Sequence, residues 1–304
     1  MDPINHLHRR LATINCKATI IPVSRAAEIR DEIFRRNVTG DIHPDLYRLW
    51  LTPLFEAAEK KLNGAKSLIV TAAPQYPLSV EFRVQDKTFT TRVPPTYTHG
   101  TDYLIHYLIT DVLTGYGLTA RKAVLPLKLT AVRSGLAAYG RNNVTYVFGM
   151  GSFFRLAAFY SDLEPPEDAP WEEAQAMETC DRCLSCVQAC PTGAIDDKRF
   201  LIRAEKCLTF FNEREQGFPD WIDPSWHNCL VGCLRCQLVC PMNKRHEKSI
   251  QFSVAFTEPE TERILSNRMS DLPVPMQTKL DQLGLTDYLP VLARNLETLM
   301  VKAG

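Results

Sequence analysis

No stretch of this 304-residue chain is apolar for the roughly 18 residues that a membrane-spanning helix needs. An excess of charge is missing too, because 35 Lys and Arg balance 35 Asp and Glu. Proteins that wrap nucleic acid usually carry a basic excess, so this balance argues against tRNA or DNA as a direct substrate. The N-terminus has no apolar signal region. We therefore expect a cytoplasmic protein with neither a membrane nor a nucleic-acid partner.

Cysteine, by contrast, is concentrated: nine of the ten lie between residues 180 and 240. The first run reads Cys180-Asp-Arg-Cys183-Leu-Ser-Cys186-Val-Gln-Ala-Cys190-Pro191. Its spacing, C-x2-C-x2-C-x3-C-P, holds a cubane iron–sulfur cluster in bacterial ferredoxins, where the fourth cysteine binds a second cluster. A second run, Cys229-Leu-Val-Gly-Cys233-Leu-Arg-Cys236-Gln-Leu-Val-Cys240-Pro241, also closes on Cys-Pro. Together the two runs predict two [4Fe-4S] clusters and a protein that moves electrons.

Other uses of cysteine fit this pattern less well. A structural zinc site takes four ligands from two well-separated Cys-x2-Cys pairs, and these runs are denser than that. A disulfide framework is typical of short secreted chains. Thiolate clusters need a reducing compartment, which again favours the cytoplasm.

Ligand counting leaves one position open. The ferredoxin rule gives the first cluster three cysteines of the first run and the remote cysteine of the second: Cys180, Cys183, Cys186 and Cys240. It gives the second cluster Cys190, Cys233, Cys236 and one more. Cys229 is one candidate for this eighth ligand, because it is the first cysteine of the second run, although three residues and not the usual two separate it from Cys233. Cys207, between the two runs, is the other candidate.

Hydrophobic patterning predicts mixed elements upstream of the cysteines. A proline- and acid-rich segment, 164–170, marks a linker. We predict an α+β protein: an N-terminal α/β domain with a mixed sheet (1–165), a bacterial-ferredoxin-like module (171–248) and a helical tail (249–304). The expected helices are 24–36 with Ser24 as N-cap, a helix within 44–63, 101–115, and one starting at the capping box Thr257-Glu-Pro-Glu260. The expected strands are 66–73, a hairpin within 80–93, 120–127, 144–148 and 153–160.

The cysteine region resembles the epoxyqueuosine reductase family. The resemblance runs through Thr179-Cys-Asp-Arg-Cys-Leu-Ser-Cys-Val-Gln-Ala-Cys-Pro-Thr-Gly-Ala-Ile195, Lys206-Cys207-Leu and Gly232-Cys-Leu-Arg-Cys-Gln-Leu-Val-Cys-Pro-Met-Asn243. In that family the isolated cysteine between the runs is the eighth ligand, and the position of Cys229 is not a cysteine. The resemblance therefore favours Cys207 as the eighth ligand.

Weaker similarity extends upstream, through 66–77, 97–103 and 134–143. It implies a cobalamin cofactor, to which electrons pass through both clusters from a low-potential donor such as ferredoxin or flavodoxin. Reductive dehalogenases share this arrangement, so a small-molecule or corrinoid substrate is expected. The side chains that the resemblance predicts near the cofactor are Tyr97, Asp102, Tyr103, Arg141 and Asn142.

One departure affects the reaction. The family's proton donor is an aspartate three residues before a proline, and here Ala123 stands three residues before Pro126. Loss of a positioned acid costs roughly 10²–10⁴-fold in rate, so we expect a changed reaction, and we assign no catalytic residue.

Three hypotheses follow from these residues. The chain is a cobalamin-dependent reductase acting on another substrate, or an electron-transfer protein that delivers electrons to a partner without an organic cofactor of its own. In a third version the clusters only stabilise a retained fold.

Overall fold

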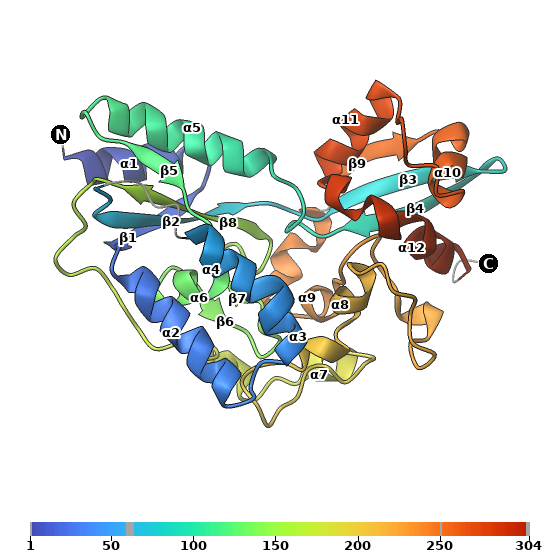
Figure 1. Ribbon diagram of the computed structural model, residues 1–304, viewed down its shortest axis with the longest axis horizontal. Coiled ribbons are helices and arrows are strands. Elements are labelled where there is room, and N and C mark those ends of the chain that lie inside the picture. The colour runs from blue at the N-terminus through green and yellow to red at the C-terminus, as the bar shows by residue number, and fades with distance from the viewer. Residues whose placement is uncertain (1, 59–63, 250, 302–304) are drawn as a thin grey trace. The chain divides into compact units, whose positions relative to one another are not determined.

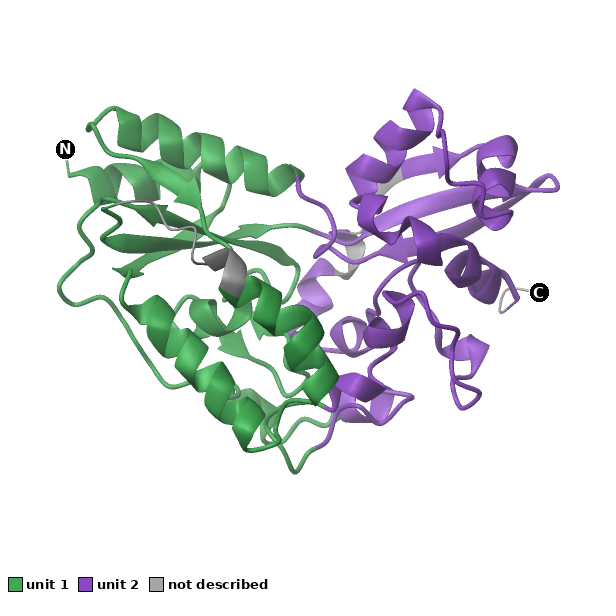
Figure 2. Cartoon of the chain, viewed as in Figure 1, with its two compact units in different colours: residues 1–75, 100–184, 197–202 green, residues 76–99, 185–196, 203–304 purple. Residues whose placement is uncertain are grey.

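The computed structural model describes residues 2–58, 64–249 and 251–301, which form two compact units (Figure 2). Unit 1 comprises 1–75, 100–184 and 197–202, and unit 2 comprises 76–99, 185–196 and 203–304. No helix in the described part of the chain is long and apolar enough to cross a bilayer. The α+β class is confirmed. The compact units cut across the boundaries expected at 165 and 171, and the three-domain division stays a prediction.

Unit 1 is built on a sheet of order β1-β2-β8-β5, whose named pairs are antiparallel rather than mixed (Figure 1). These strands are β1 (Lys17–Pro22), β2 (Ser67–Pro74), β8 (Phe154–Ser161) and β5 (Ala120–Lys122), with a small ribbon of β6 (Ala138–Tyr139) and β7 (Thr145–Tyr146). The helical elements are α1 (Pro3–Ala12), α2 (Arg25–Val38), α3 (Pro44–Leu46), the π-helix η1 (Tyr47–Leu51), α4 (Thr52–Ala58), α5 (Gly100–Thr114), α6 (Leu127–Arg133) and the 3₁₀ turn η2 (Glu178–Cys180).

The central strand β2 is buried along nearly its whole length because both faces of the sheet are covered. Side chains alternate between faces along a strand. Ile69 packs with residues of α1 and α5, and its neighbours Leu68 and Val70 pack in a second cluster that includes Ala131 of α6. The continuous apolar run that predicts a strand at 66–73 is therefore the direct consequence of helices on both faces.

Several expected boundaries in unit 1 were wrong for local reasons. Ser24 has helical backbone angles (φ −58°, ψ −27°), so it does not take the extended conformation of an N-cap. The strand expected at 120–127 ends at Lys122, and α6 begins at Leu127, directly after Pro126. The strand expected at 144–148 is the two-residue β7. The helix expected within 44–63, by contrast, is confirmed up to Ala58 as α3, η1 and α4, and 59–63 lie outside the described residues.

Unit 2 contains a sheet of order β4-β3-β9, made of β3 (Leu78–Val84), β4 (Lys87–Val93) and β9 (Gln251–Phe256). Strand β9 comes from the predicted tail and pairs parallel to β3, so the tail is helical but also completes a sheet. The α-helices of this tail are α10 (Glu258–Leu265), α11 (Val274–Leu283) and α12 (Leu289–Val301). The remaining helical segments of unit 2 are α7 (Ser185–Ala189), η3 (Ala204–Lys206), α8 (Leu208–Asn212), η4 (Pro224–Trp226), α9 (Arg235–Leu238), η5 (Pro241–Ser249) and η6 (Thr286–Tyr288).

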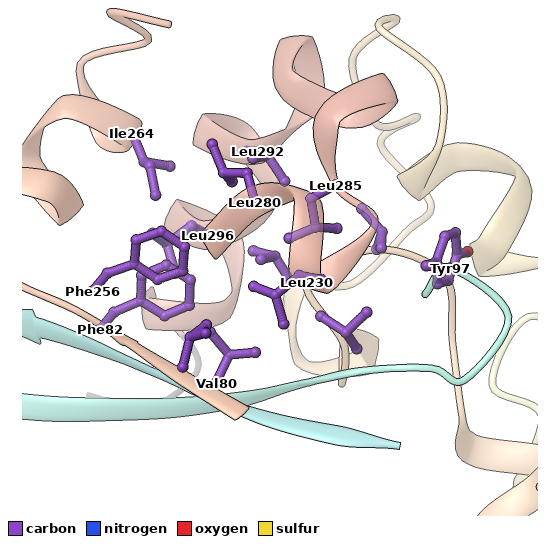
Figure 3. Close-up of a cluster of buried hydrophobic side chains, with 14 of the residues drawn as sticks. Val80, Phe82, Tyr97, Leu230, Phe256, Ile264, Leu280, Leu285, Leu292 and Leu296 are labelled. Atoms are coloured by element: carbon purple, nitrogen blue, oxygen red, sulfur yellow. The ribbon is translucent and has the colours of Figure 1, made fainter. Parts of the chain in front are cut away.

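The core of unit 2 joins this sheet to the second cysteine run (Figure 3). Phe82 of β3 and Phe256 of β9 stack with ring centroids 5.0 Å apart. Leu230 and Val231, which precede Cys233, are buried in the same cluster. The expected capping box is confirmed, because the Glu260 carboxylate accepts from the backbone N–H of Thr257 at 2.7 Å. The tail thus supports the loop that carries the second run.

Gly284 terminates α11 at a position where no other residue fits. Its φ of +66° is left-handed, and a Cβ there would lie 1.8 Å from the backbone oxygen of Tyr97. The backbone conformation alone costs a non-glycine residue about 1–2 kcal/mol, before the steric clash is counted. We expect Gly284→Ala to lower the urea midpoint of unfolding markedly, whereas Gly217→Ala, where a Cβ meets nothing within 4 Å, should leave it nearly unchanged. Equal midpoints for the two variants would contradict this packing.

Candidate metal centre

The first cysteine run is a series of short turns. Cys180 ends η2, and the N–H of Cys183 donates to the Cys180 carbonyl at 3.2 Å. Cys186 lies in α7, and the N–H of Cys190 donates to the Val187 carbonyl at 3.3 Å. Cys180 and Cys183 belong to unit 1, whereas Cys186 and Cys190 belong to unit 2. All four are half-buried, which leaves their thiols at the boundary between protein and solvent.

The second run turns sharply at Gly232, one residue before Cys233. Gly232 has φ +66°, and a Cβ there would lie 2.4 Å from the Tyr97 hydroxyl oxygen. Cys236 lies in α9, and the N–H of Cys240 donates to the Gln237 carbonyl at 3.3 Å. A glycine is therefore required where the chain bends to present Cys233.

Cys207 lies beside two other predicted ligands. It precedes α8 with an extended backbone (φ −68°, ψ 136°). Burial, and then the neighbouring Cys233 and Cys190, raise the pKa of its thiol to about 11, against the opposing effect of hydrogen bonds from the backbone N–H and the hydroxyl of Thr209. The Cys207 thiol therefore interacts electrostatically with those of Cys190 and Cys233, which belong to the same unit.

Cys229 has different surroundings. Its side chain is 1% exposed, and its Sγ donates to the Asn228 side-chain oxygen at 3.0 Å. Burial first, and then Cys233, raise the pKa of the Cys229 thiol well above its ordinary value. The thiol is therefore a protonated hydrogen-bond donor inside the loop, although it lies near the same neighbour as Cys207.

The donor set fits iron–sulfur chemistry. Among the described residues, no three His, Cys, Asp or Glu side chains converge as ligands of a single ion. A cubane makes no such demand, because each of its thiolates binds a different iron. The pKa values of the half-buried Cys207 and Cys233 thiols are raised, so cluster insertion must release tightly held protons, and assembly in unit 2 should be favoured by mildly alkaline pH.

Tyr97, predicted to lie near a cofactor, packs against the second cysteine run within unit 2. It is 7% exposed, and its hydroxyl donates to a Glu213 carboxylate oxygen. Burial and the adjacent Glu213 raise its pKa well above the ordinary value. Its ring packs edge-on against Tyr288, with centroids 5.2 Å apart. The Tyr97 hydroxyl is therefore a neutral group engaged in packing the Gly232 turn.

Asp102 and Tyr103, neighbours on α5 of unit 1, have opposite exposures. Asp102 accepts from Arg155 Nε at 2.7 Å and Nη2 at 3.0 Å, and from Lys122 Nζ at 2.7 Å. Burial raises the pKa of Asp102, but the hydrogen bonds from Arg155 and Lys122 outweigh it, so the pKa lies below its ordinary value. Tyr103 is 76% exposed. Of this pair, the tyrosine ring is the group open to a ligand.

Arg141 and Asn142 lie in the turn between β6 and β7. Arg141 donates to the Cys180 carbonyl at 2.8 Å and to the Asp197 carbonyl at 3.2 Å. Asn142 is buried and donates to the Tyr146 hydroxyl at 3.0 Å. Arg141 also lines a pocket of roughly 230 Å³ with Lys198 and Arg199, which is smaller than the ~300–1,000 Å³ of typical ligand sites. Within unit 1, Arg141 fixes the backbone beside the first predicted ligand.

These placements leave the role of the five predicted cofactor residues a prediction. The polar groups of Asp102, Arg141 and Asn142 have partners within unit 1, and that of Tyr97 has its partner within unit 2. The sequence analysis missed Asn228, whose amide reaches the Cys233 sulfur at 3.2 Å. An asparagine five residues before a ligand carries no motif that could have identified it.

Ala123, in the position of the family's proton donor, is a core residue of unit 1. It is 4% exposed, its N–H donates to the Ala158 carbonyl at 2.8 Å, and it packs in an apolar cluster with Leu68 and Tyr160. The Asp102 carboxylate, which accepts from Lys122 just before Ala123 in the sequence, has its pKa lowered by Arg155 and Lys122. The segment therefore offers no acid in the position where the family carries one.

Known proteins match this chain at the cysteine region and in the fold. The 4Fe-4S double cluster binding domain family matches residues 179–243. The epoxyqueuosine reductase of Escherichia coli (strain K12) is 34% identical over 115 residues, which are 38% of this chain and 29% of that protein. The epoxyqueuosine reductase of Cyclobacterium marinum is 30% identical over 199 residues, 61% of each chain. The matched region thus spans less than two thirds of either relative.

The fold has a close parallel among solved structures. That of epoxyqueuosine reductase from Streptococcus thermophilus superposes with a TM-score of 0.67 at 16% identity, covering 100% of this chain and 82% of that one. This match shows the fold, while the two cysteine runs and the matched domain give the chain a double [4Fe-4S] cluster module. More particularly, the chain is similar to epoxyqueuosine reductases in its cysteine region and in its fold, as the sequence analysis expected, and it carries alanine at position 123.

Proposed function

We propose that this chain is an iron–sulfur oxidoreductase that passes electrons through two [4Fe-4S] clusters to a cobalamin-type cofactor, and thereby reduces a substrate other than epoxyqueuosine. The observation that carries the proposal is the set of thiols Cys190, Cys207 and Cys233 gathered in unit 2 within a matched double-cluster domain. Two clusters in one small module imply a route for electrons, and such a route implies a terminal acceptor.

The proposed ligand sets follow from spacing and from these neighbours. The first cluster takes Cys180, Cys183, Cys186 and Cys240, and the second takes Cys190, Cys207, Cys233 and Cys236. The placement of Cys207 beside Cys190 and Cys233 supports it as the eighth ligand over Cys229. A low-potential carrier such as ferredoxin or flavodoxin is the proposed donor.

The corrinoid acceptor is proposed from the similarity to epoxyqueuosine reductases. When bound, it would supply a cobalt that can be reduced to a strong nucleophile. The exposed ring of Tyr103 is the candidate contact that unit 1 offers. Asp102 and Arg141 have a structural role in this proposal. Asp102 anchors α5 through its ion pair with Arg155, and Arg141 holds the backbone at Cys180 through a hydrogen bond to its carbonyl.

A changed substrate is proposed from the missing acid. Removal of an epoxide oxygen needs a proton, and a positioned donor is worth roughly 10²–10⁴-fold. Ala123 cannot supply the proton, and the Asp102 carboxyl is ionised at neutral pH because its pKa is lowered. The substrate is therefore a molecule whose reduction does not depend on an acid at position 123. A small molecule or a corrinoid meets this condition.

A direct assay tests this part of the proposal. The reconstituted chain, supplied with cobalamin and a low-potential reductant, is given an epoxyqueuosine-modified RNA stem loop, and the modified base is followed by mass spectrometry. We expect no conversion above the level of the cluster-free chain. Conversion at a rate typical of an enzyme, on the order of 1 s⁻¹ or more, would overturn the proposed change of substrate.

A second function has an observation in its favour. Four of the five predicted cofactor side chains already have partners within their own unit, as expected of a protein that holds no corrin. In this version the chain delivers electrons to a partner, which could be a corrinoid protein. A test of whether the chain binds cobalamin distinguishes the two functions, because only the first requires it.

A further inference from the structure

The side-chain amide of Asn228 is held in a single orientation beside a predicted cluster ligand. Its Nδ2 donates to the Sγ of Cys233 at 3.2 Å. Its Oδ1 accepts from the Leu234 backbone N–H at 2.9 Å and from the Cys229 thiol at 3.0 Å. Both partners of the oxygen are donors, so the amide cannot flip without losing two hydrogen bonds.

The loop that carries Asn228 is fastened on both sides. The Arg235 guanidinium reaches back to the Trp226 carbonyl at 2.8 Å and to the Ser225 carbonyl at 2.9 Å. On the other side, the buried Asn295 donates to the Leu230 carbonyl at 2.9 Å. The amide is therefore placed by the fold rather than by its own rotamer preference.

Such a hydrogen bond changes the electron affinity of a cluster. Reduction adds negative charge to the cluster and its thiolates, and an N–H donor directed at a ligand sulfur stabilises the reduced form more than the oxidised form. Half-burial of Asn228 and of Cys233 strengthens the effect, because less water competes for the sulfur. The backbone N–H of Arg235 also bonds to the Cys233 sulfur, so this ligand receives two donors.

We infer that Asn228 is a positioning residue that raises the reduction potential of the cluster bound by Cys233, and that Cys229 serves it by holding the amide oxygen. The inference rests on the proposed function in taking Cys233 as a ligand of the second cluster and Cys207, not Cys229, as the eighth ligand. It gives the ninth cysteine of the region a role that is not ligation.

Substitution of the amide donor tests the inference. Asn228→Asp keeps an oxygen for Leu234 and Cys229 but replaces the donor with a second carboxylate oxygen, and Asn228→Leu removes both functions at similar volume. The measurement is an anaerobic redox titration of the reconstituted chain, followed by electron paramagnetic resonance. We expect one of the two potentials to fall by about 59 mV, a tenfold change in the reduction equilibrium of a one-electron couple, while the other stays in place.

Controls separate this effect from damage to the loop. Ser225→Ala changes the same loop away from the sulfur and should leave both potentials unchanged. Iron content should stay at about eight per chain in every variant, the number for two cubanes. If fully loaded Asn228→Asp and Asn228→Leu keep both wild-type potentials, the inference is wrong.

A measurement on the unsubstituted chain covers the case in which the variants lose a cluster. With ¹⁵N in the asparagine side-chain amides, pulsed electron paramagnetic resonance of the reduced second cluster should detect a coupling to one such nitrogen. Absence of the coupling would overturn the inference. Neither experiment involves cobalamin, so a failure to bind cobalamin would remove the proposed acceptor and leave this result standing.

Discussion

Cys207→Ala should bind about four irons per chain after anaerobic reconstitution, whereas Cys229→Ala should still bind about eight, the number that two cubanes require. Cys207 lies beside Cys190 and Cys233, so its removal deprives the second cluster of a ligand. Cys229 directs its proton to Asn228 and is 1% exposed, so its removal takes away a hydrogen bond and not a ligand.

The comparison uses iron and sulfide analysis with the absorption near 400 nm of each variant, measured at about pH 8 as reconstituted. Cys16→Ala, which alters a buried thiol of unit 1 outside the cysteine runs, is the matched control and should match the wild type. Loss of half the iron in Cys229→Ala with full loading of Cys207→Ala would reverse the assignment of the eighth ligand.

Asp102→Asn should lower the free energy of unfolding of unit 1 by about 3–5 kcal/mol, the usual cost of removing one partner of a buried ion pair. The Asp102 side chain is 3% exposed and that of Arg155 is 14% exposed. The substitution leaves the Arg155 guanidinium buried without its counter-charge. Lys122 is 51% exposed and contributes less, because water screens it.

The matched control for this substitution lies on the same helix. Asp111 pairs with Arg10 at 3.6 Å across an exposed surface, so Asp111→Asn should cost less than about 1 kcal/mol. Both are measured by urea unfolding under anaerobic conditions at pH 7. Equal midpoints for the two variants would contradict the buried pair.

The pH dependence of the same pair has a definite sign. The pKa of Asp102 is lower in the folded chain than the ~3.9 of an unfolded aspartate. Its stabilisation is therefore fully present above pH ~4 and is lost as the pH falls through the folded value. The difference in stability between wild type and Asp102→Asn should be constant from pH 7 to pH 5 and narrow below pH 4. A difference that widened on acidification would contradict the lowered pKa.

Elements with strong local signals were predictable from the sequence. Three elements have a signal within their own residues that explains why they form: the apolar run of β2, the helical periodicity of α5 and the capping box before α10. The pairing of β9 with β3 could not be predicted, because it joins segments about 170 residues apart and depends on a core that both share.

The residues of the predicted site were likewise predictable from the sequence only in part. Cysteine spacing predicts seven of the eight ligands, because cluster geometry restricts the turns between them, and leaves Cys207 and Cys229 as candidates for the eighth. The partners of Asp102, by contrast, come from β5 and β8, and no spacing in the sequence relates Arg155 to α5. The burial of Ala123 in the core of unit 1 also needed the structure, because a single alanine gives no sign of which side faces the core.

Titration with hydroxocobalamin tests the central claim most directly. The anaerobically reconstituted chain, with about eight irons for two cubanes, is titrated and followed by absorption and electron paramagnetic resonance. The account predicts one cobalamin per chain, in a base-off Co(II) form that accepts electrons from the reduced clusters. Fully loaded clusters with no cobalamin bound at micromolar concentrations would contradict it and make the chain an electron carrier for another protein.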